Sequence, residues 1–216
     1  MKLDTSSYDR IVSFASQQYG VEIKFKDESR FMKALGYLLF FNPKFMTRFV
    51  TVIGKTVYFP SRQRVEQDPD SAARVLCHEL VHLTDARRVG ALSFSLSYLF
   101  PQCLALLALS AIFVGPWALL FLAFLAPLPA PLRTFWELRG YAMTDAVAYR
   151  MDGKFTFKDW MAGQFTSGSY FFMWPFLSDI KDRIEENRKL ILNGTLHEKI
   201  PAATDILNAY FGAVDE

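Results

Sequence analysis

A long segment without a single charged residue limits the folds that are open to this chain. It runs from Val89 to Leu132. A membrane-spanning helix needs about 20 apolar residues, and Phe94–Phe113 supplies such a stretch, whereas Trp117–Leu132 is shorter and rich in proline. Gly115-Pro116 between the two is a turn signal. The sequence therefore predicts an apolar helical hairpin that spans a membrane, re-enters it, or is buried in protein.

The residues around this segment favour the membrane. Arg87 and Arg88 precede it and Arg133 follows it, and basic residues beside membrane segments stay on the cytoplasmic side. The polar start of the chain, Met1–Thr5, lacks the apolar core of a signal peptide. We expect a membrane-associated protein, with residues 92–132 in the membrane and the parts of the chain on either side of them in the cytoplasm. The alternative is a soluble protein or a component of a large assembly.

Composition excludes some classes of protein. The chain has 216 residues and a formal net charge of +2, and its basic residues are scattered rather than gathered in a stripe. Nucleic acid is therefore not expected as a partner. Two cysteines do not make the disulfide framework of a small secreted protein. The length allows a hydrophobic core that needs no such support.

Hydrophobic periodicity and turn signals predict an α+β fold that is mostly helical. Alternating apolar and polar residues predict a strand at 21–26, and β-branched arms around Gly54-Lys55 predict a β-hairpin at 49–60. Helical spacing and capping residues predict helices at 8–19, 28–41, 68–88, 134–150, 175–192 and 202–211. We divide the chain into an N-terminal part (1–90), the apolar hairpin (91–132) and a C-terminal helical part (133–216).

The segment His78-Glu79-Leu80-Val81-His82 carries the clearest chemical signal. A helical turn has 3.6 residues, so imidazoles four residues apart leave the same face and can bind one metal ion. Zinc lowers the pKa of a bound water molecule to about 7. Glu79, which adjoins the ligands without being one, can take the proton of that water. Chance is the competing explanation, but two of only three histidines form the motif.

A third protein ligand is expected, because hydrolytic zinc sites usually have three. Arg88 occupies the position six residues after the second histidine, which rules out the compact pattern with a third histidine or an aspartate there. Glu137 is the best candidate, since it lies on the next polar helix and is followed by the small Gly140. The alternatives are His197, or a solvated Glu137 paired with a nearby arginine, Arg133 or Arg139.

Other residues are candidates for supporting roles. Asp85 lies one turn after His82 and either fixes the tautomer of a histidine or forms a surface ion pair with Arg88 or Arg74. Cys77 points away from the ligand face and is expected in the core. An oxyanion could be stabilised by one of three side chains: Tyr141, Tyr149 or His197.

Two short motifs resemble those of the gluzincins, the zincin metallopeptidases whose third ligand is a glutamate. They are His78–Asp85 and Glu137–Gly140. Two features are similar to the mitochondrial inner-membrane metalloprotease that processes an ATP-synthase subunit. They are the aspartate at the end of the first motif, Asp85, and the Glu-x-Arg-small pattern of the second. The apolar segment between them is similar to the HtpX and CAAX-prenyl-protease type, although that type has an aspartate where this chain has Tyr141.

The resemblance implies a zincin-like core and a zinc metalloendopeptidase with one zinc ion per chain. It makes His78, His82 and Glu137 the ligands and Glu79 the base. In zincins an edge strand before the metal helix pairs with the extended peptide substrate. In this chain that strand would come from the predicted hairpin, through Val50, Val52, Val57 and Phe59. The alternative function is a zinc-binding or anchoring protein without catalysis, in a larger assembly.

Overall fold

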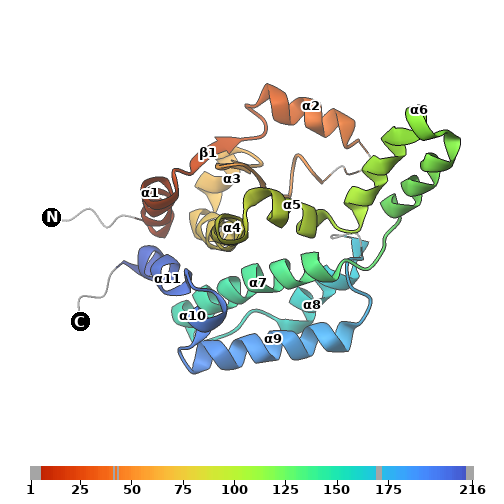
Figure 1. Cartoon of the computed structure of the whole chain (residues 1–216). Helices are drawn as coiled ribbons and strands as arrows, with labels where there is room; N and C mark the ends of the chain where they lie inside the picture. Colours follow the sequence, from red (N-terminus) through yellow and green to blue (C-terminus); the bar gives the residue numbers. More distant parts are fainter. Residues whose placement is uncertain (1–5, 41, 43, 169–171, 213–216) are drawn as a thin grey trace. The chain divides into compact units, whose positions relative to one another are not determined.

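The computed structural model describes residues 6–40, 42, 44–168 and 172–212 (Figure 1). The chain start 1–5 and position 41, the predicted end of one helix, lie outside the described residues. The protein is mostly helical and contains a three-stranded sheet, which confirms the α+β class. Its residues form two compact units: 1–83 with 202–216, and 84–201. The last helix groups with the first unit.

The sheet of the first unit is built from β1 (Glu22–Phe25), β2 (Thr51–Ile53) and β3 (Thr56–Phe59). The predicted hairpin is confirmed, since β2 and β3 pair antiparallel across a turn in which Gly54 has φ 62°. A positive φ costs a glycine little, because it has no Cβ. β1 pairs with β3 in parallel, so the strand order is β1-β3-β2.

This order corrects part of the substrate-strand prediction. β3 has a neighbour on both sides, so Val57 and Phe59 lie in the middle of the sheet and cannot offer a free edge to a peptide. Both side chains are buried. Among the described strands, β2 is an edge strand, and it contains Val52 and directly follows Val50. The parallel pairing with β1 was not predicted.

Along the chain, the strands of the first unit are preceded, separated and followed by helices. They are α1 (Ser7–Tyr19), α2 (Arg30–Leu38), α3 (Arg62–Gln67) and α11 (Ala203–Phe211). α1 ends where predicted, at Gly20 in the left-handed conformation. α11 packs against α1, and Arg10 donates hydrogen bonds from Nε and Nη2 to the carbonyl oxygen of Tyr210 at 3.1 and 2.7 Å. These contacts explain why the end of the chain joins the first unit.

The helix that carries the histidines is α4 (Pro69–Val89), and it belongs to both units. Its start is capped as predicted, because Asp68 Oδ1 accepts a hydrogen bond from the Ser71 amide at 2.9 Å. It ends before Gly90, whose φ is 90°. A helix without a break holds its side chains at fixed angles to one another. His78, His82 and Asp85 therefore have fixed positions relative to one another on α4.

The second unit contains α7 (Pro131–Asp152), α8 (Lys158–Thr166), α9 (Leu177–Leu192) and α10 (Leu196–Lys199). α7 and α9 lie side by side (Figure 1). Between the elements is an apolar core, formed by Ala130, Leu138, Tyr141, Met161, Ala162, Phe165, Met173, Ile180 and Ile184. The predicted polar helix after the apolar segment is thus present as α7, but half of its residues are buried.

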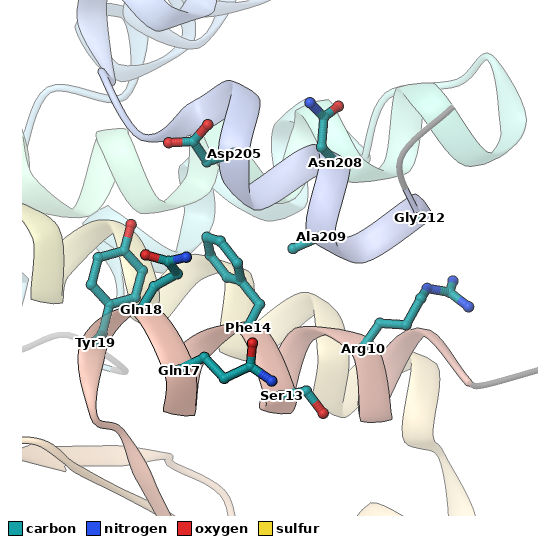
Figure 2. A pocket seen from close by; sticks show the side chains of 10 residues that line it. All are labelled: Arg10, Ser13, Phe14, Gln17, Gln18, Tyr19, Asp205, Asn208, Ala209 and Gly212. Atoms are coloured by element: carbon teal, nitrogen blue, oxygen red, sulfur yellow. The ribbon is translucent and has the colours of Figure 1, made fainter. Parts of the chain in front are cut away.

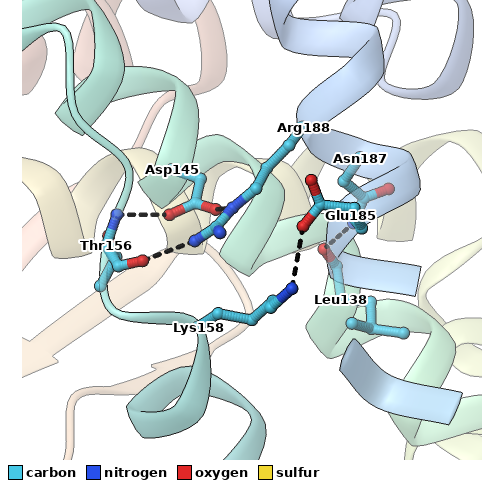
Figure 3. Close-up of polar contacts among 7 residues, drawn as sticks. All are labelled: Leu138, Asp145, Thr156, Lys158, Glu185, Asn187 and Arg188. Atoms are coloured by element: carbon cyan, nitrogen blue, oxygen red, sulfur yellow. Dashed lines mark hydrogen bonds and ion pairs between the residues drawn. The ribbon is translucent and has the colours of Figure 1, made fainter. Parts of the chain in front are cut away.

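A buried polar network joins α7 to α9 (Figure 3). Asp145 accepts hydrogen bonds from Arg188 Nε at 2.9 Å and from the Thr156 amide at 3.0 Å. Arg188 Nη2 also donates to the Thr156 carbonyl oxygen at 2.5 Å. The network fixes the loop that follows α7, because each charged group has a partner of opposite charge or a backbone dipole.

The apolar segment folds as short helices: α5 (Ala91–Leu99), η1 (Gln102–Ser110), α6 (Ala111–Val114) and η2 (Pro116–Leu125). η1 and η2 contain 3₁₀ turns and pack against each other around Gly115, so the apolar hairpin is present. Phe94–Phe113, the stretch with the length of a membrane-spanning helix, is not a single helix. The chain bends by 96° after α5, because Phe100 precedes a proline and takes an extended conformation.

Within the described residues, no single helix has both the length and the apolar character to cross a membrane. One bent pair, Ala91–Leu99 with Gln102–Val114, meets both criteria together. The hairpin projects away from α7 and α9 (Figure 1). Its placement in the fold therefore leaves both arms outside the apolar core of the second unit.

Candidate metal centre

His78 and His82 lie on one face of α4, a turn apart. Their Nε2 atoms are 3.1 Å from each other, and their ring centroids are 4.8 Å apart. His82 is buried and His78 is half-buried. Two nitrogens bound to one tetrahedral zinc ion at the usual bond length are about 3.3 Å apart. The separation in α4 is therefore one that a shared ion accepts.

Glu137 completes a group of three side chains that could hold a metal ion. One ligand atom from each of His78, His82 and Glu137 lies within 4.8 Å of the other two. It is the one group of histidine, cysteine and acidic side chains that lies this close together among the described residues. Two imidazoles and a carboxylate are a donor set of hydrolytic zinc sites. The three residues predicted as ligands are thus brought together.

The carboxylate of Glu137 is held inside the protein. Its side chain is 2% exposed, and Oε1 accepts a hydrogen bond from the hydroxyl group of Tyr98. The alternative of a solvated surface carboxylate is therefore wrong. A hydrogen bond to a metal-binding carboxylate fixes its orientation, and such partners commonly affect metal affinity. Tyr98 is accordingly part of this site.

Tyr98 was not predicted as a site residue. It occupies the last turn of α5, where its ring stacks on Phe94 with centroids 5.8 Å apart and lies under the guanidinium group of Arg133 at 5.1 Å. A second hydrogen bond, from Trp136 Nε1 to Ser97 Oγ at 2.9 Å, also joins α7 to α5. The available signal was a phenol in an uncharged segment, because its hydroxyl group needs a partner when buried.

Asp85 forms an ion pair that sequence spacing did not reveal. Arg139 donates from Nε to Oδ2 at 2.7 Å and from Nη2 to Oδ1 at 2.6 Å. The same guanidinium group donates from Nη1 to the Lys199 carbonyl oxygen. The surface pairs proposed as alternatives, with Arg88 or Arg74, are therefore wrong, because Asp85 is 3% exposed and faces Arg139. The pair ties α4 to α7 next to the residues that could hold a metal.

The other candidates for supporting roles have different surroundings. Tyr141 is buried in the apolar core, with its ring 5.4 Å from that of Phe165. Tyr149 stacks on Phe155 at 4.7 Å and is twelve residues, or about 18 Å of helix, beyond Glu137. His197 is exposed on α10 and is not part of the metal-binding group. Cys77 is in the core as predicted, and burial raises the pKa of its thiol.

A buried lysine lies in the same unit as Glu79. Lys26, directly after β1, is 0% exposed and donates from Nζ to the Phe45 carbonyl oxygen at 2.7 Å. Burial lowers the pKa of this ammonium group to about 8, and the negative charge of Glu79 opposes that shift. The predicted base therefore has a cationic neighbour within electrostatic reach.

A cavity of about 740 Å³ in the first unit lies between α1 and α11 (Figure 2). Its lining includes the polar side chains of Arg10, Gln17, Asp205 and Asn208. None of the predicted site residues lines it. The side chains that could hold a metal ion lie on α4 and α7 instead, so the cavity and the candidate site are separate features.

The arrangement on α4 and α7 brings together three side chains that could hold a metal ion. Glu79 adjoins His78 in sequence, and the Tyr98–Glu137 and Arg139–Asp85 contacts lie beside the group. Comparisons of the chain with protein-family models, with curated proteins and with solved structures returned no match, so its function has to be inferred from these residues.

Proposed function

We propose that the protein is a zinc metallopeptidase with one zinc ion per chain, held by His78, His82 and Glu137. The observation that carries the proposal is that these side chains converge within 4.8 Å. A carboxylate in the position of a general base, Glu79, adds what a purely structural site would not need. The likeness of the two motifs to the gluzincins supports the same assignment.

Each residue then has a defined task. A bound zinc ion would lower the pKa of a water molecule to about 7 and polarise the carbonyl group of the substrate. Glu79 takes the proton of the attacking water and passes it to the nitrogen of the leaving amine. Tyr98 holds the Glu137 carboxylate in place through its hydroxyl group.

The substrate is a peptide or protein in an extended conformation. β2 is the edge strand that supports this, because its outer N–H and C=O groups are not used by another described strand. Main-chain pairing at such an edge binds peptides with little regard to their side chains. Val52 lies in this strand, and we assign cleavage inside a chain, as by an endopeptidase.

The test compares zinc content and peptide hydrolysis in matched variants. Glu79→Gln should keep one zinc ion per chain and lose hydrolysis, since the amide has nearly the same shape but cannot accept the proton. The double variant His78→Ala/His82→Ala should lose both. Stoichiometric zinc in the double variant would refute the metal site.

The same experiment separates catalysis from a structural role. A zinc-binding protein without catalysis would retain zinc in every Glu79 variant and show no hydrolysis in the wild type. Activity of Glu79→Gln within a few-fold of the wild type would remove Glu79 from the mechanism. Asp70→Asn, an exposed acidic residue in the first turn of the same helix, serves as the control and should change neither readout.

A further inference from the structure

The hairpin of η1, α6 and η2 has its large and small side chains in an unusual arrangement. The residues buried in it are alanines: Ala105, Ala108 and Ala118. Leucines point outward instead, with Leu106, Leu109 and Leu120 exposed by 67%, 71% and 69%. A helical hairpin in water would bury its leucines between the arms. In membranes, small residues lie between helices so that the backbones approach closely, and large apolar residues face lipid.

The tip of the hairpin is as apolar as its arms. From Ala111 to Leu132 the chain has no charged, amide or hydroxyl side chain. Large apolar side chains at the tip are highly exposed, with Ile112 at 86%, Phe113 at 87% and Trp117 at 79%. A turn that emerged in water on the far side of a bilayer would be expected to carry polar residues. This turn is suited to hydrocarbon.

The backbone of the turn is compatible with that environment. The Gly115 amide donates to the Ala111 carbonyl oxygen at 3.0 Å, and the Ala118 amide donates to the Gly115 carbonyl oxygen at 3.2 Å. Lipid offers no hydrogen-bonding partners, so backbone groups inside a bilayer must be paired within the protein. The turn meets this requirement with its own bonds.

The length of the arms sets the depth of insertion. η2 has 10 residues, and at the rise of a 3₁₀-helix it is about 20 Å long. The hydrocarbon core of a bilayer is about 30 Å thick. An arm of this length that starts at one surface ends inside the hydrocarbon. At the other end of the segment, Arg87 and Arg88 are exposed in the last turn of α4, where they can meet lipid headgroups.

We propose that this hairpin is a wedge that inserts into a lipid bilayer from one side, with the Gly115 turn inside the hydrocarbon and both ends on the side of entry. Apart from the face where the arms meet, exposed leucines are found on both arms, which favours lipid over a protein partner that would cover one face. The proposal goes beyond the peptidase assignment and does not depend on it, because vesicle binding and zinc content are measured separately.

The first test is flotation of the full chain with vesicles of phosphatidylcholine and phosphatidylserine. The wild type should float with the vesicles, and Phe113→Glu/Trp117→Glu should bind at least about 100-fold more weakly, because two charges would enter hydrocarbon. Leu38→Glu, at a leucine on α2 that is 70% exposed, is the matched control and should float like the wild type. All three proteins should keep the same zinc content.

The second test locates the tip. Phe113→Cys and Trp117→Cys, each in a Cys77→Ala/Cys103→Ala background, are bound to vesicles with a membrane-impermeant maleimide either outside or enclosed. Neither cysteine should react until the vesicles are dissolved in SDS. Reaction with the enclosed reagent would show a full crossing and overturn the one-sided wedge. Failure of the wild type to float, or normal flotation of the charged tip variant, would show that lipid is not what covers the hairpin.

Discussion

Asp85 and Arg139 form a bidentate ion pair that joins α4 to α7, with nitrogen–oxygen distances of 2.7 and 2.6 Å. Asp85 lies one turn beyond His82, and Arg139 lies two residues beyond Glu137. The pair thus joins the two helices close to the residues that could hold a metal ion. Because both charged groups are almost fully buried, the brace is sensitive to loss of either partner.

Removing Asp85 alone should destabilise the protein severely. Asp85→Ala leaves the Arg139 guanidinium group buried without its carboxylate, and breaking such a pair costs about 3–5 kcal/mol in the free energy of unfolding. Asp85→Ala/Arg139→Met should recover part of that loss. Urea unfolding at pH 7 measures both effects. The matched control is Glu185→Gln, which breaks the exposed pair with Lys158 and should cost no more than about 1 kcal/mol.

Replacing Tyr98 should weaken metal binding without unfolding the protein. Tyr98→Phe removes only the hydroxyl group that donates to Glu137. Loss of such a partner of a metal ligand typically lowers affinity by about 10–100-fold. Competition with a chelator of known zinc affinity measures the change. Tyr149→Phe, farther along α7 and stacked on Phe155, is the control; an equal loss of affinity in both variants would argue against a specific role for Tyr98.

The identity of the third ligand is tested by a pair of substitutions. Glu137→Gln should lose stoichiometric zinc after dialysis, because a neutral amide is a much poorer ligand than a carboxylate. His197→Gln should retain it, since His197 is exposed on α10. Metal analysis of the purified variants decides between them. The reverse pattern would make His197 the third ligand.

Lys26 should make stability depend on pH in the alkaline range. Burial lowers the pKa of its ammonium group from 10.5 to about 8 in the folded protein. Between these values the unfolded chain binds more protons, so the free energy of unfolding should rise with pH. The contribution is fully present above 10.5 and is lost as pH falls through about 8; its upper limit is about 3 kcal/mol.

The measurement compares the wild type with Lys26→Met by chemical unfolding from pH 7.5 to 10.5. Methionine keeps an unbranched side chain in the site but does not titrate. The difference in unfolding free energy between the two proteins should change with pH in the stated direction. A difference that is constant over this range would mean that the folded pKa of Lys26 is not lowered.

The sequence predicted well those features that depend on residues a few positions apart, such as helix caps and tight turns. The cap at Asp68 and the stop at Gly90 defined α4, because capping depends on residues a few positions apart. The spacing of His78 and His82 followed from helix geometry in the same way. The turn at Gly54 likewise predicted the hairpin, since a two-residue connection leaves few backbone choices.

Long-range features were missed because no local pattern reports them. The ion pair between Asp85 and Arg139 joins residues 54 positions apart. Parallel pairing of β1 with β3 depends on a crossover whose partner strand cannot be read from alternation alone. Tyr98 lies in a long uncharged run, and its partner Glu137 is 39 positions away, so no local spacing indicates the contact. Mean apolar character also hid the break at Pro101, although proline disfavours helix at the residue before it.

Because α4 has no break, the number of residues between His82 and Asp85 decides which way the aspartate points. At about 100° per residue, His78, His82 and Asp85 fall within an arc of about 60° on the helix surface. Inserting or deleting one residue between His82 and Asp85 would swing the aspartate out of that arc and away from Arg139, even if every side chain were kept. This stretch should therefore tolerate conservative exchanges better than any change in the number of residues, and natural variants of the chain should differ there in composition but not in spacing.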